Sequence, residues 1–325
     1  MLESNILATL VYYDIFDLSL RKEELFKRLC VFGHLFHGKK RETVSRSQFD
    51  YSLEQLLKTG KINLKNNYYY LFEREYLIPF RLKKEKLAIS RIKRTRWAVG
   101  WLRFAPNLLA VFASGSLAMR NTDELSDLDI LIITKSGRIW LTRLYVTVIL
   151  SLLGIRRKVT DKIAPNKVCP NHYITDKSLL VPFKSIYNAQ TYSNLIPIYV
   201  RGNKIIEEFK KANSWVLDYV HEWGNIESTN EILKTGLPGF LAKIKEKSLN
   251  NKLGDFFEKL ARNYQSRRIA SNPLTKQSGG RVVFNDEQLE FHPSSIEEEI
   301  VRKYNQRMKE LGLGELAVEK NSGLL

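Results

Sequence analysis

The 325-residue chain carries 52 Lys and Arg against 35 Asp and Glu, a formal net charge of +17. Its hydrophobic fraction of 44% is enough to form cores, so the composition excludes a globally disordered chain. The length predicts about two or three domains, and the basic excess favours a polyanionic partner such as nucleic acid, a nucleotide or an acidic membrane surface. A lysine-rich surface without a specific partner is an equally good explanation of this charge.

Cysteine content and the most apolar stretch bear on the compartment. Cys30 and Cys169 lie far apart without metal-ligand spacing, which indicates a reducing environment and no disulfide framework. The N-terminus has acidic residues where an export signal needs basic ones. Residues 139–155 are slightly short for a membrane span and contain Arg143. We therefore expect a buried amphipathic helix there, a cytoplasmic protein and no membrane partner.

Residues 1–72 show the pattern of a small helical unit closed by a hairpin. Apolar side chains recur at helical spacing near the start, a second helix is expected after Ser19 as its N-cap, and a third from Ser47. Residues 61–71 alternate as two short strands around a turn. Three helices followed by a hairpin predict a winged-helix domain. Residues 33–46 are expected to form a loop, and GHLFHGKK within it is no phosphate-binding motif because it follows a helix.

The charge of this unit leaves its role open. Its candidate recognition helix is nearly neutral, and its wing offers only Lys61 and Lys65 for phosphate contacts. Binding of nucleic acid and a docking or substrate-presenting role both remain possible readings of residues 1–72.

Residues 73–104 form a basic linker, expected to be helical after Pro79. Between Glu73 and Arg103 there are ten Lys or Arg against three Glu. Trp97 and Trp101 are expected to pack or stack, and the predicted buried stripe is Leu82, Ala88, Ile89, Ile92, Val99 and Leu102. A solvated charged face is the usual explanation of such a run, and a contact with nucleic acid or a triphosphate is the sharper alternative.

Alternating strands and helices follow over residues 105–200, which predicts an α/β domain with a largely buried sheet. Residues 201–325 are predicted to be mainly helical, with helices over 203–223 and 238–271. A short final unit is expected from Gly279, with a helix over 296–311. Two helical segments, 204–219 and 257–268, are expected to wall a ligand cleft.

The segment LLAVFASGSLAMRNTDELSDLDILIIT, residues 108–134, carries the chemistry. An apolar strand ends at Gly115-Ser116, whose backbone amides at a helix start can seat a phosphate. Asp127 and Asp129 are two residues apart on the next strand, so their side chains project to one face about 7 Å apart. Two carboxylates there need a neutralising cation, and Mg²⁺ prefers carboxylates together with triphosphate oxygens.

Gly-Ser, a short helix and Asp-x-Asp entering an apolar strand resemble the nucleotidyltransferase superfamily typified by DNA polymerase beta. The resemblance covers residues 108–175 and implies a nucleotidyltransferase domain over residues 105–200. It implies Mg²⁺-dependent transfer of a nucleoside monophosphate from a nucleoside triphosphate, most simply ATP, to a hydroxyl acceptor. Asp127 and Asp129 would be the catalytic metal ligands. Residues implied to contact the nucleotide are Gly115, Ser116, Ser126 and Asn171.

One departure from that family concerns the next strand, where a third carboxylate is usual. Asn171 is nearest to the expected place, and Asp161 and Asp176 only flank the strand. An amide can ligate a metal through its oxygen but cannot act as a general base. The alternative function is therefore a nucleic-acid-binding regulator or antitoxin-like protein that senses a nucleotide without turning it over.

Overall fold

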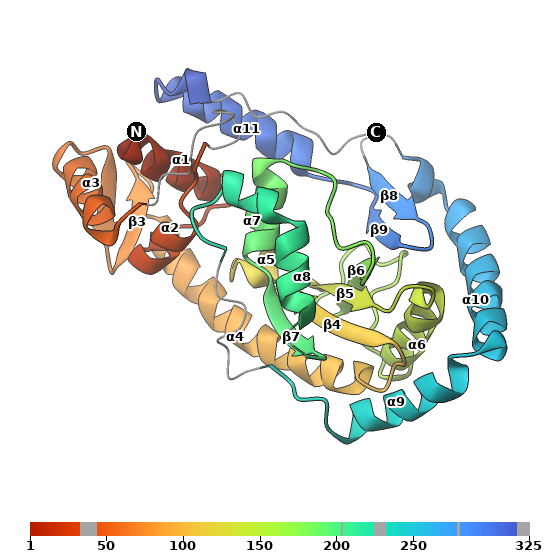
Figure 1. The fold of residues 1–325 in the computed structure, drawn as a ribbon. Coiled ribbons are helices and arrows are strands. Elements are labelled where there is room, and N and C mark those ends of the chain that lie inside the picture. The colour runs from red at the N-terminus through yellow and green to blue at the C-terminus, as the bar shows by residue number, and fades with distance from the viewer. Residues whose placement is uncertain (33–43, 203, 224–231, 278–279, 317–325) are drawn as a thin grey trace.

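The computed structural model describes residues 1–32, 44–202, 204–223, 232–277 and 280–316. It is a mixed α/β fold with a small three-stranded sheet and a larger six-stranded sheet (Figure 1). The α/β class expected from the sequence is therefore confirmed. The predicted loop over 33–46 lies mostly outside the described residues, as do Asn203 and Gly279.

The N-terminal unit contains three helices and a small sheet, in the order α1 (Leu2–Asp14), β1 (Leu20–Arg21), α2 (Lys22–Lys27), α3 (Arg46–Lys58), β2 (Ile62–Lys65) and β3 (Tyr68–Leu71). Its strands lie in the order β1-β3-β2, all antiparallel. The predicted cap of the second helix is wrong by two residues, and the third helix starts one residue before the predicted Ser47. Ser45 caps α3, because its Oγ accepts the Gln48 amide at 3.3 Å. Ser19 is buried, and α2 starts after Arg21.

The basic linker is a single long helix, α4 (Leu77–Leu102). Four of the six residues predicted to be buried are buried, but Leu82 and Ile89 are exposed. Arg81 and Arg91, which directly precede the expected stripe members Leu82 and Ile92, take part in the buried face as well. Arg81 is stabilised there by Glu24 and Glu85 at 2.7 Å. Residue type alone ranks leucine above arginine for burial, and only these ion partners reverse that order.

The six-stranded sheet has the order β7-β4-β5-β6-β9-β8. Only β5 and β6 are parallel, and all the other neighbours are antiparallel. The strands are β4 (Leu108–Ala113), β5 (Leu128–Thr134), β6 (Val168–Thr175), β7 (Ile196–Val200), β8 (Arg281–Phe284) and β9 (Gln288–His292). The sheet thus includes two strands from the region expected to be mainly helical.

Alternating residues of the central strands contribute to two different cores. Ala110 and Phe112 of β4 face a core that includes α1, α3, α7 (Ile186–Ser193), α8 (Lys204–Ala212) and α11 (Glu297–Glu310). Val111 and Ala113 face a second core with α4, α6 (Ile139–Leu152) and α10 (Lys252–Ala270). Helices therefore cover both faces of the sheet, and the N-terminal unit packs into the first core through α1 (Figure 1).

The apolar stretch at 139–155 forms α6, which packs against α10 and α4. Trp140, Val146 and Leu150 are buried, as expected for an amphipathic helix at the sheet. In the described part of the chain, no helix combines the length and apolarity that crossing a bilayer requires.

Candidate active site

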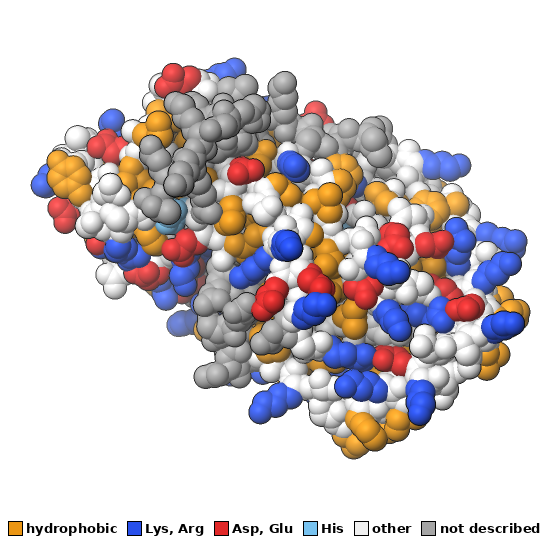
Figure 2. Space-filling model, viewed as in Figure 1, with side chains coloured by type: hydrophobic (Ala, Val, Ile, Leu, Met, Phe, Trp, Pro, Cys, Tyr) orange, Lys and Arg blue, Asp and Glu red, His pale blue; other side chains and the backbone are white. Residues whose placement is uncertain are grey.

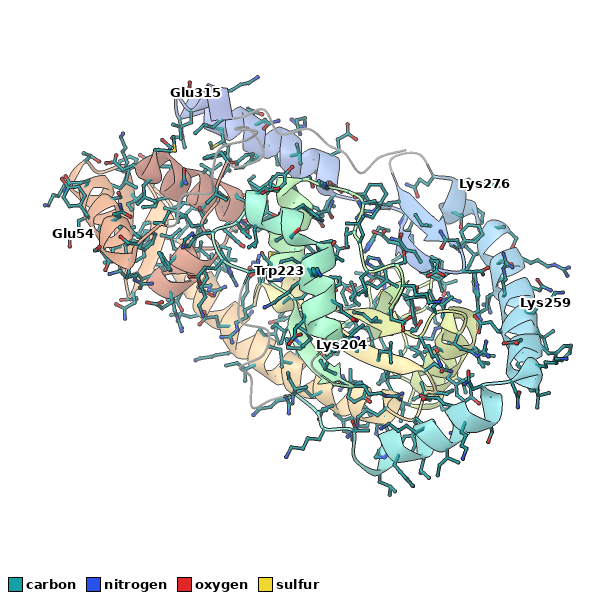
Figure 3. All side chains as sticks on the ribbon, viewed as in Figure 1. Glu54, Lys204, Trp223, Lys259, Lys276 and Glu315 are labelled. Carbon is teal, nitrogen blue, oxygen red and sulfur yellow. The ribbon has the colours of Figure 1, made fainter. Side chains whose placement is uncertain are left out.

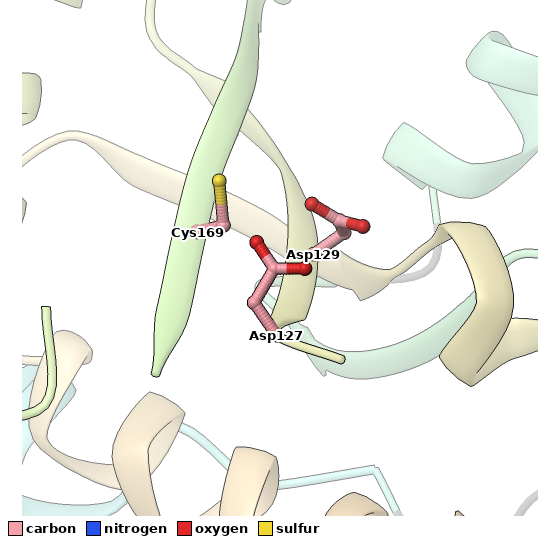
Figure 4. Close-up of side chains that lie close together, drawn as sticks. All are labelled: Asp127, Asp129 and Cys169. Carbon is pink, nitrogen blue, oxygen red and sulfur yellow. The ribbon is translucent and has the colours of Figure 1, made fainter. Parts of the chain in front are cut away.

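Asp127 and Asp129 converge with a third side chain where β5 begins (Figure 4). The two carboxylates and the Cys169 sulfur each offer an atom within 4.8 Å of the others. Parallel pairing of β5 with β6 sets Asp129 beside Cys169. The two-residue spacing of the acids therefore produces the shared face that a strand requires, and the neighbouring strand adds a thiol.

The bend at Gly115 brings backbone against Asp129. Gly115 has a φ of +59°, and a Cβ built on it would lie 2.9 Å from Asp129 Oδ2. The Ser114 amide donates to the Asp129 carbonyl oxygen at 3.0 Å. A residue with a side chain is disfavoured at position 115 both by the left-handed backbone and by this contact. The turn into α5 (Gly115–Ala118) is thus held directly beside the acids.

The two acids are in different electrostatic environments. Burial, and after it the charge of Asp127, raises the pKa of Asp129 above its usual value. Asn171 Nδ2 donates to Asp129 Oδ1 at 2.8 Å. Arg157 forms an ion pair with Asp127 Oδ2. Burial also raises the pKa of the Cys169 thiol, so the sulfur is a neutral neighbour of two acids rather than a thiolate.

Helix α4 holds the loop that leads to Asp127. Arg91 is 2% exposed and donates to Thr122 Oγ1, to the Glu124 carbonyl oxygen at 2.9 Å and to Asn166 Oδ1 at 3.1 Å. Lys84 Nζ donates to Asn121 Oδ1 at 2.9 Å. Some of the linker's positive charge therefore positions the loop between α5 and β5 instead of facing a ligand.

A cavity of about 360 Å³ has Asp129 in its wall. Its far wall comes from α7 and from the segment that follows β9. Residues along it include Asn171, Tyr187, Thr191, Tyr192, Phe291 and Ser294. The expectation that segments 204–219 and 257–268 wall the cleft is wrong, because neither supplies a lining residue. β9 joins the edge of β6, and the chain leaving it crosses the cavity where those helices were expected.

The other predicted site residues have partners or positions outside the acidic cluster. Ser116 lies in α5 and does not line the cavity. Ser126 Oγ donates to Asp123 Oδ1 at 3.0 Å, which closes a local turn. Asp161 accepts the Lys158 amide at 2.9 Å within its own turn, and Asp176 accepts the Ser136 amide at 2.8 Å, which links the turn after β6 to the segment after β5. Within the described residues, the acidic cluster comprises two carboxylates and no third.

Sequence reasoning missed Cys169 and Arg157. Cys169 had a detectable signal, because it lies two residues before Asn171 and a strand places such residues on one face. Arg157 had none, since it follows α6 in an irregular segment and reaches Asp127 only after the sheet has formed.

No family model matches this chain, and neither the curated proteins nor the solved structures include a significant match. Inference about function therefore rests on the geometry of this site.

Proposed function

We propose that the chain is a Mg²⁺-dependent nucleotidyltransferase, which moves a nucleoside monophosphate from a nucleoside triphosphate to a hydroxyl acceptor. The observation that carries this proposal is the meeting of Asp127 and Asp129 beside the Gly115 bend. Paired carboxylates beside a backbone that approaches without a side chain suit a metal-bound phosphate group. The order of elements around them supports the nucleotidyltransferase resemblance.

The donor set suits a hard divalent cation. Desolvation and the negative charge of Asp127 both disfavour the ionised form of Asp129. A cation between the two carboxylates would offset both effects. The cluster offers two carboxylates and one thiol, whose pKa is raised by burial, so oxygen ligands predominate, which favours Mg²⁺ over softer metals. When bound, the cation would polarise a phosphate and neutralise developing charge.

The protein's own groups would orient and enclose the substrate. Asn171 holds Asp129 in place through its amide nitrogen, so its side chain serves as a hydrogen-bond donor there rather than as an oxygen ligand. Tyr187 and Phe291 offer aromatic surface in the cavity, and Thr191 and Ser294 offer hydroxyl groups. This combination suits the stacking and hydrogen bonding of a nucleoside.

A second candidate function is nucleotide sensing without turnover, in a nucleic-acid-binding regulator. It is favoured by the engagement of Asp161 and Asp176 in hydrogen bonds with backbone amides, which leaves no third carboxylate as general base in the acidic cluster of the described residues. Arg157, paired with Asp127, already supplies one positive charge to the site. The order of helices and strands over residues 1–72 supports a winged helix, the module that such a regulator would use.

The two functions separate in one experiment on Asp127→Asn and Asp129→Asn, with Asp161→Asn as a matched control. Calorimetry measures binding of the four ribonucleotides with and without Mg²⁺, and α-labelled nucleotide measures transfer. We expect both site variants to lose Mg²⁺-dependent binding and transfer by at least about 100-fold, as removal of a charge-stabilising group does, and Asp161→Asn to retain both.

Undiminished transfer in the Asp127→Asn and Asp129→Asn variants would overturn the proposed mechanism. Binding by the unaltered chain that needs Mg²⁺, but without any nucleotide consumption, would select the sensing function instead.

A further inference from the structure

Helices α9 (Gly236–Leu249) and α10 bury mainly small residues and turn most of their large apolar residues toward solvent. The buried positions are Gly239 and Ala242 on α9, and Gly254, Ala261, Gln265 and Ile269 on α10. The exposed apolar positions are Leu237, Phe240, Leu241, Ile244, Leu253, Phe256, Phe257, Leu260 and Tyr264. A surface helix normally buries its large apolar side chains, so this reversed arrangement indicates a contact outside the chain.

These exposed side chains form continuous stripes rather than scattered positions. They recur every three or four residues on each helix, which places them on one side of it. Leu237 is 69% exposed and Phe256 is 60% exposed. Trp97 and Trp101 of α4 extend the surface, because together with Pro238 they line an open hollow of about 520 Å³ at the start of α9. We call the nine exposed residues and these two tryptophans the apolar rim.

The acidic side chains of α9 and α10 contact the body of the protein, whereas the basic side chains of these helices are exposed. The three acids of α9 and α10 that interact with the body are Glu246 with Arg201, Asp255 with Arg138, and Glu258 with the amides of Trp140 and Leu141. All the Lys and Arg side chains of the two helices are exposed, namely Lys243, Lys245, Lys247, Lys252, Lys259, Arg262, Arg267 and Arg268. Two of them contact the body, Arg262 through Asp286 and Lys245 over the ring of Tyr145. Figure 3 shows Lys259 on the outer side of α10, and Figure 2 shows apolar and basic side chains interleaved along this margin. The rim therefore presents apolar surface with positive charge.

We propose that the apolar rim docks on the surface of an anionic lipid bilayer, with its apolar side chains among the acyl chains and its lysines at the headgroups. Basic residues flanking exposed Trp, Phe and Leu are the composition of interfacial helices. Tryptophan suits this depth because one end of its ring is apolar and the other is polar. This contact is not a membrane span, but it departs from the expectation of no membrane partner drawn from the sequence.

Other occupants fit the rim less well. Nucleic acid would pair with the lysines but has no apolar surface to cover Leu253, Ile244 or Leu260. A second copy, joined through the same face, would bring lysines against lysines. The two helices run along the outer margin of the molecule (Figure 1), so the face is convex, and a fluid bilayer adapts to it without needing a matching hollow.

Vesicle co-sedimentation of the full chain tests this proposal. Vesicles of phosphatidylcholine alone are compared with vesicles that also contain phosphatidylserine, at low and high salt. We expect binding only to the anionic vesicles, weakened by salt. Phe256→Ser with Phe257→Ser should lower the partition coefficient on the order of tenfold or more. Phe72→Ser, at a position 64% exposed in the N-terminal unit, is the matched control and should leave binding unchanged.

Thermal unfolding of each variant verifies that the variant is folded. The double substitution Lys252→Glu with Lys259→Glu is an independent variant, which should also weaken vesicle binding and reduce the salt dependence of that binding. Absence of binding to anionic vesicles would overturn the proposal, as would equal losses in the Phe72 control. Two other outcomes would assign the rim to a different partner. They are dimerisation that depends on concentration, or binding of duplex nucleic acid, each lost in the Phe256 and Phe257 variant while vesicles stay unbound.

Discussion

At the scale of single residues, Gly115 constrains the site more tightly than any sequence motif suggests. Its positive φ requires a residue without a side chain, and Asp129 fills the space where a Cβ would be. Gly137 and Gly154 also have positive φ, but a Cβ at either would meet nothing within 4 Å. A side chain at Gly115 would therefore cause both backbone strain and a clash with Asp129, whereas one at Gly137 or Gly154 would cause strain alone.

We predict that Gly115→Ala and Gly137→Ala each lower the free energy of unfolding by about 1–2 kcal/mol, the cost of a left-handed conformation at a residue with a side chain. Only Gly115→Ala should also abolish Mg²⁺-dependent nucleotide binding, because the added methyl group displaces Asp129. Chemical denaturation and calorimetry measure the two effects. Equal nucleotide affinity in both variants would show that the close approach at Gly115 has no role in the site.

At the scale of elements, α4 is a brace for the active-site loop as well as a link between two units. Its buried face carries Arg91, whose guanidinium contacts three separate points of the structure around residues 122–166. Arg94, one turn along, is exposed and donates to the Asn166 carbonyl oxygen at 3.1 Å. The difference in burial means that the two arginines should respond differently to removal.

Arg91→Met should lower the free energy of unfolding on the order of 2–3 kcal/mol, because the Glu124 and Asn166 oxygens lose a buried charged donor. It should also weaken Mg²⁺-dependent nucleotide binding, since the loop that positions Asp127 is no longer fixed. Arg94→Met should stay within about 0.5 kcal/mol of the unaltered chain, as surface changes do. Denaturant unfolding, with binding measured under conditions where each variant is folded, checks both. Similar losses from the two substitutions would contradict the brace.

At the scale of the whole molecule, the C-terminal region completes the sheet and closes the cavity. Arg281 of β8 contacts Glu290 of β9 at 2.6 Å and Glu297 of α11 at 3.0 Å. Glu297 also accepts from Ser185 at 2.6 Å, which ties the same cluster to the start of α7. His172 is buried near it, and burial, followed by the charge of Arg281, lowers its pKa to about 3.

This arrangement predicts acid destabilisation through His172. The pKa of His172 in the folded protein lies below its ordinary value of about 6.5. Between these two values the unfolded chain is protonated at His172, whereas the folded protein is not. Stability is therefore present above pH about 6.5 and is lost as the pH falls toward 3. Asp129, whose pKa is raised, acts with the opposite sign. Denaturant unfolding from pH 7 to 5 is thus best compared between Asp129→Asn and the same variant with His172→Gln. The added substitution should flatten the pH dependence, and an unchanged slope would contradict it.

Much of the local structure follows from the sequence by itself, because its periodicities depend on near neighbours. The amphipathic pattern of α6 and the apolar runs of β4 and β5 predicted those elements, and two-residue spacing predicted that Asp127 and Asp129 share a face.

Tertiary structure decided what depends on residues distant in the chain. Only pairing of β5 with β6 sets Cys169 beside Asp129, and only the folded sheet brings Arg157 to Asp127. Arg81 replaces Leu82 in the buried face of α4 because it pairs there with Glu85, one turn along the same helix, and with Glu24, which only the fold brings to it. Strand β9 pairs with β6 although it lies more than a hundred residues further along the chain, and the wall of the cavity therefore differs from the one expected. The order of strands in a sheet depends on long-range packing and not on the preferences of one segment.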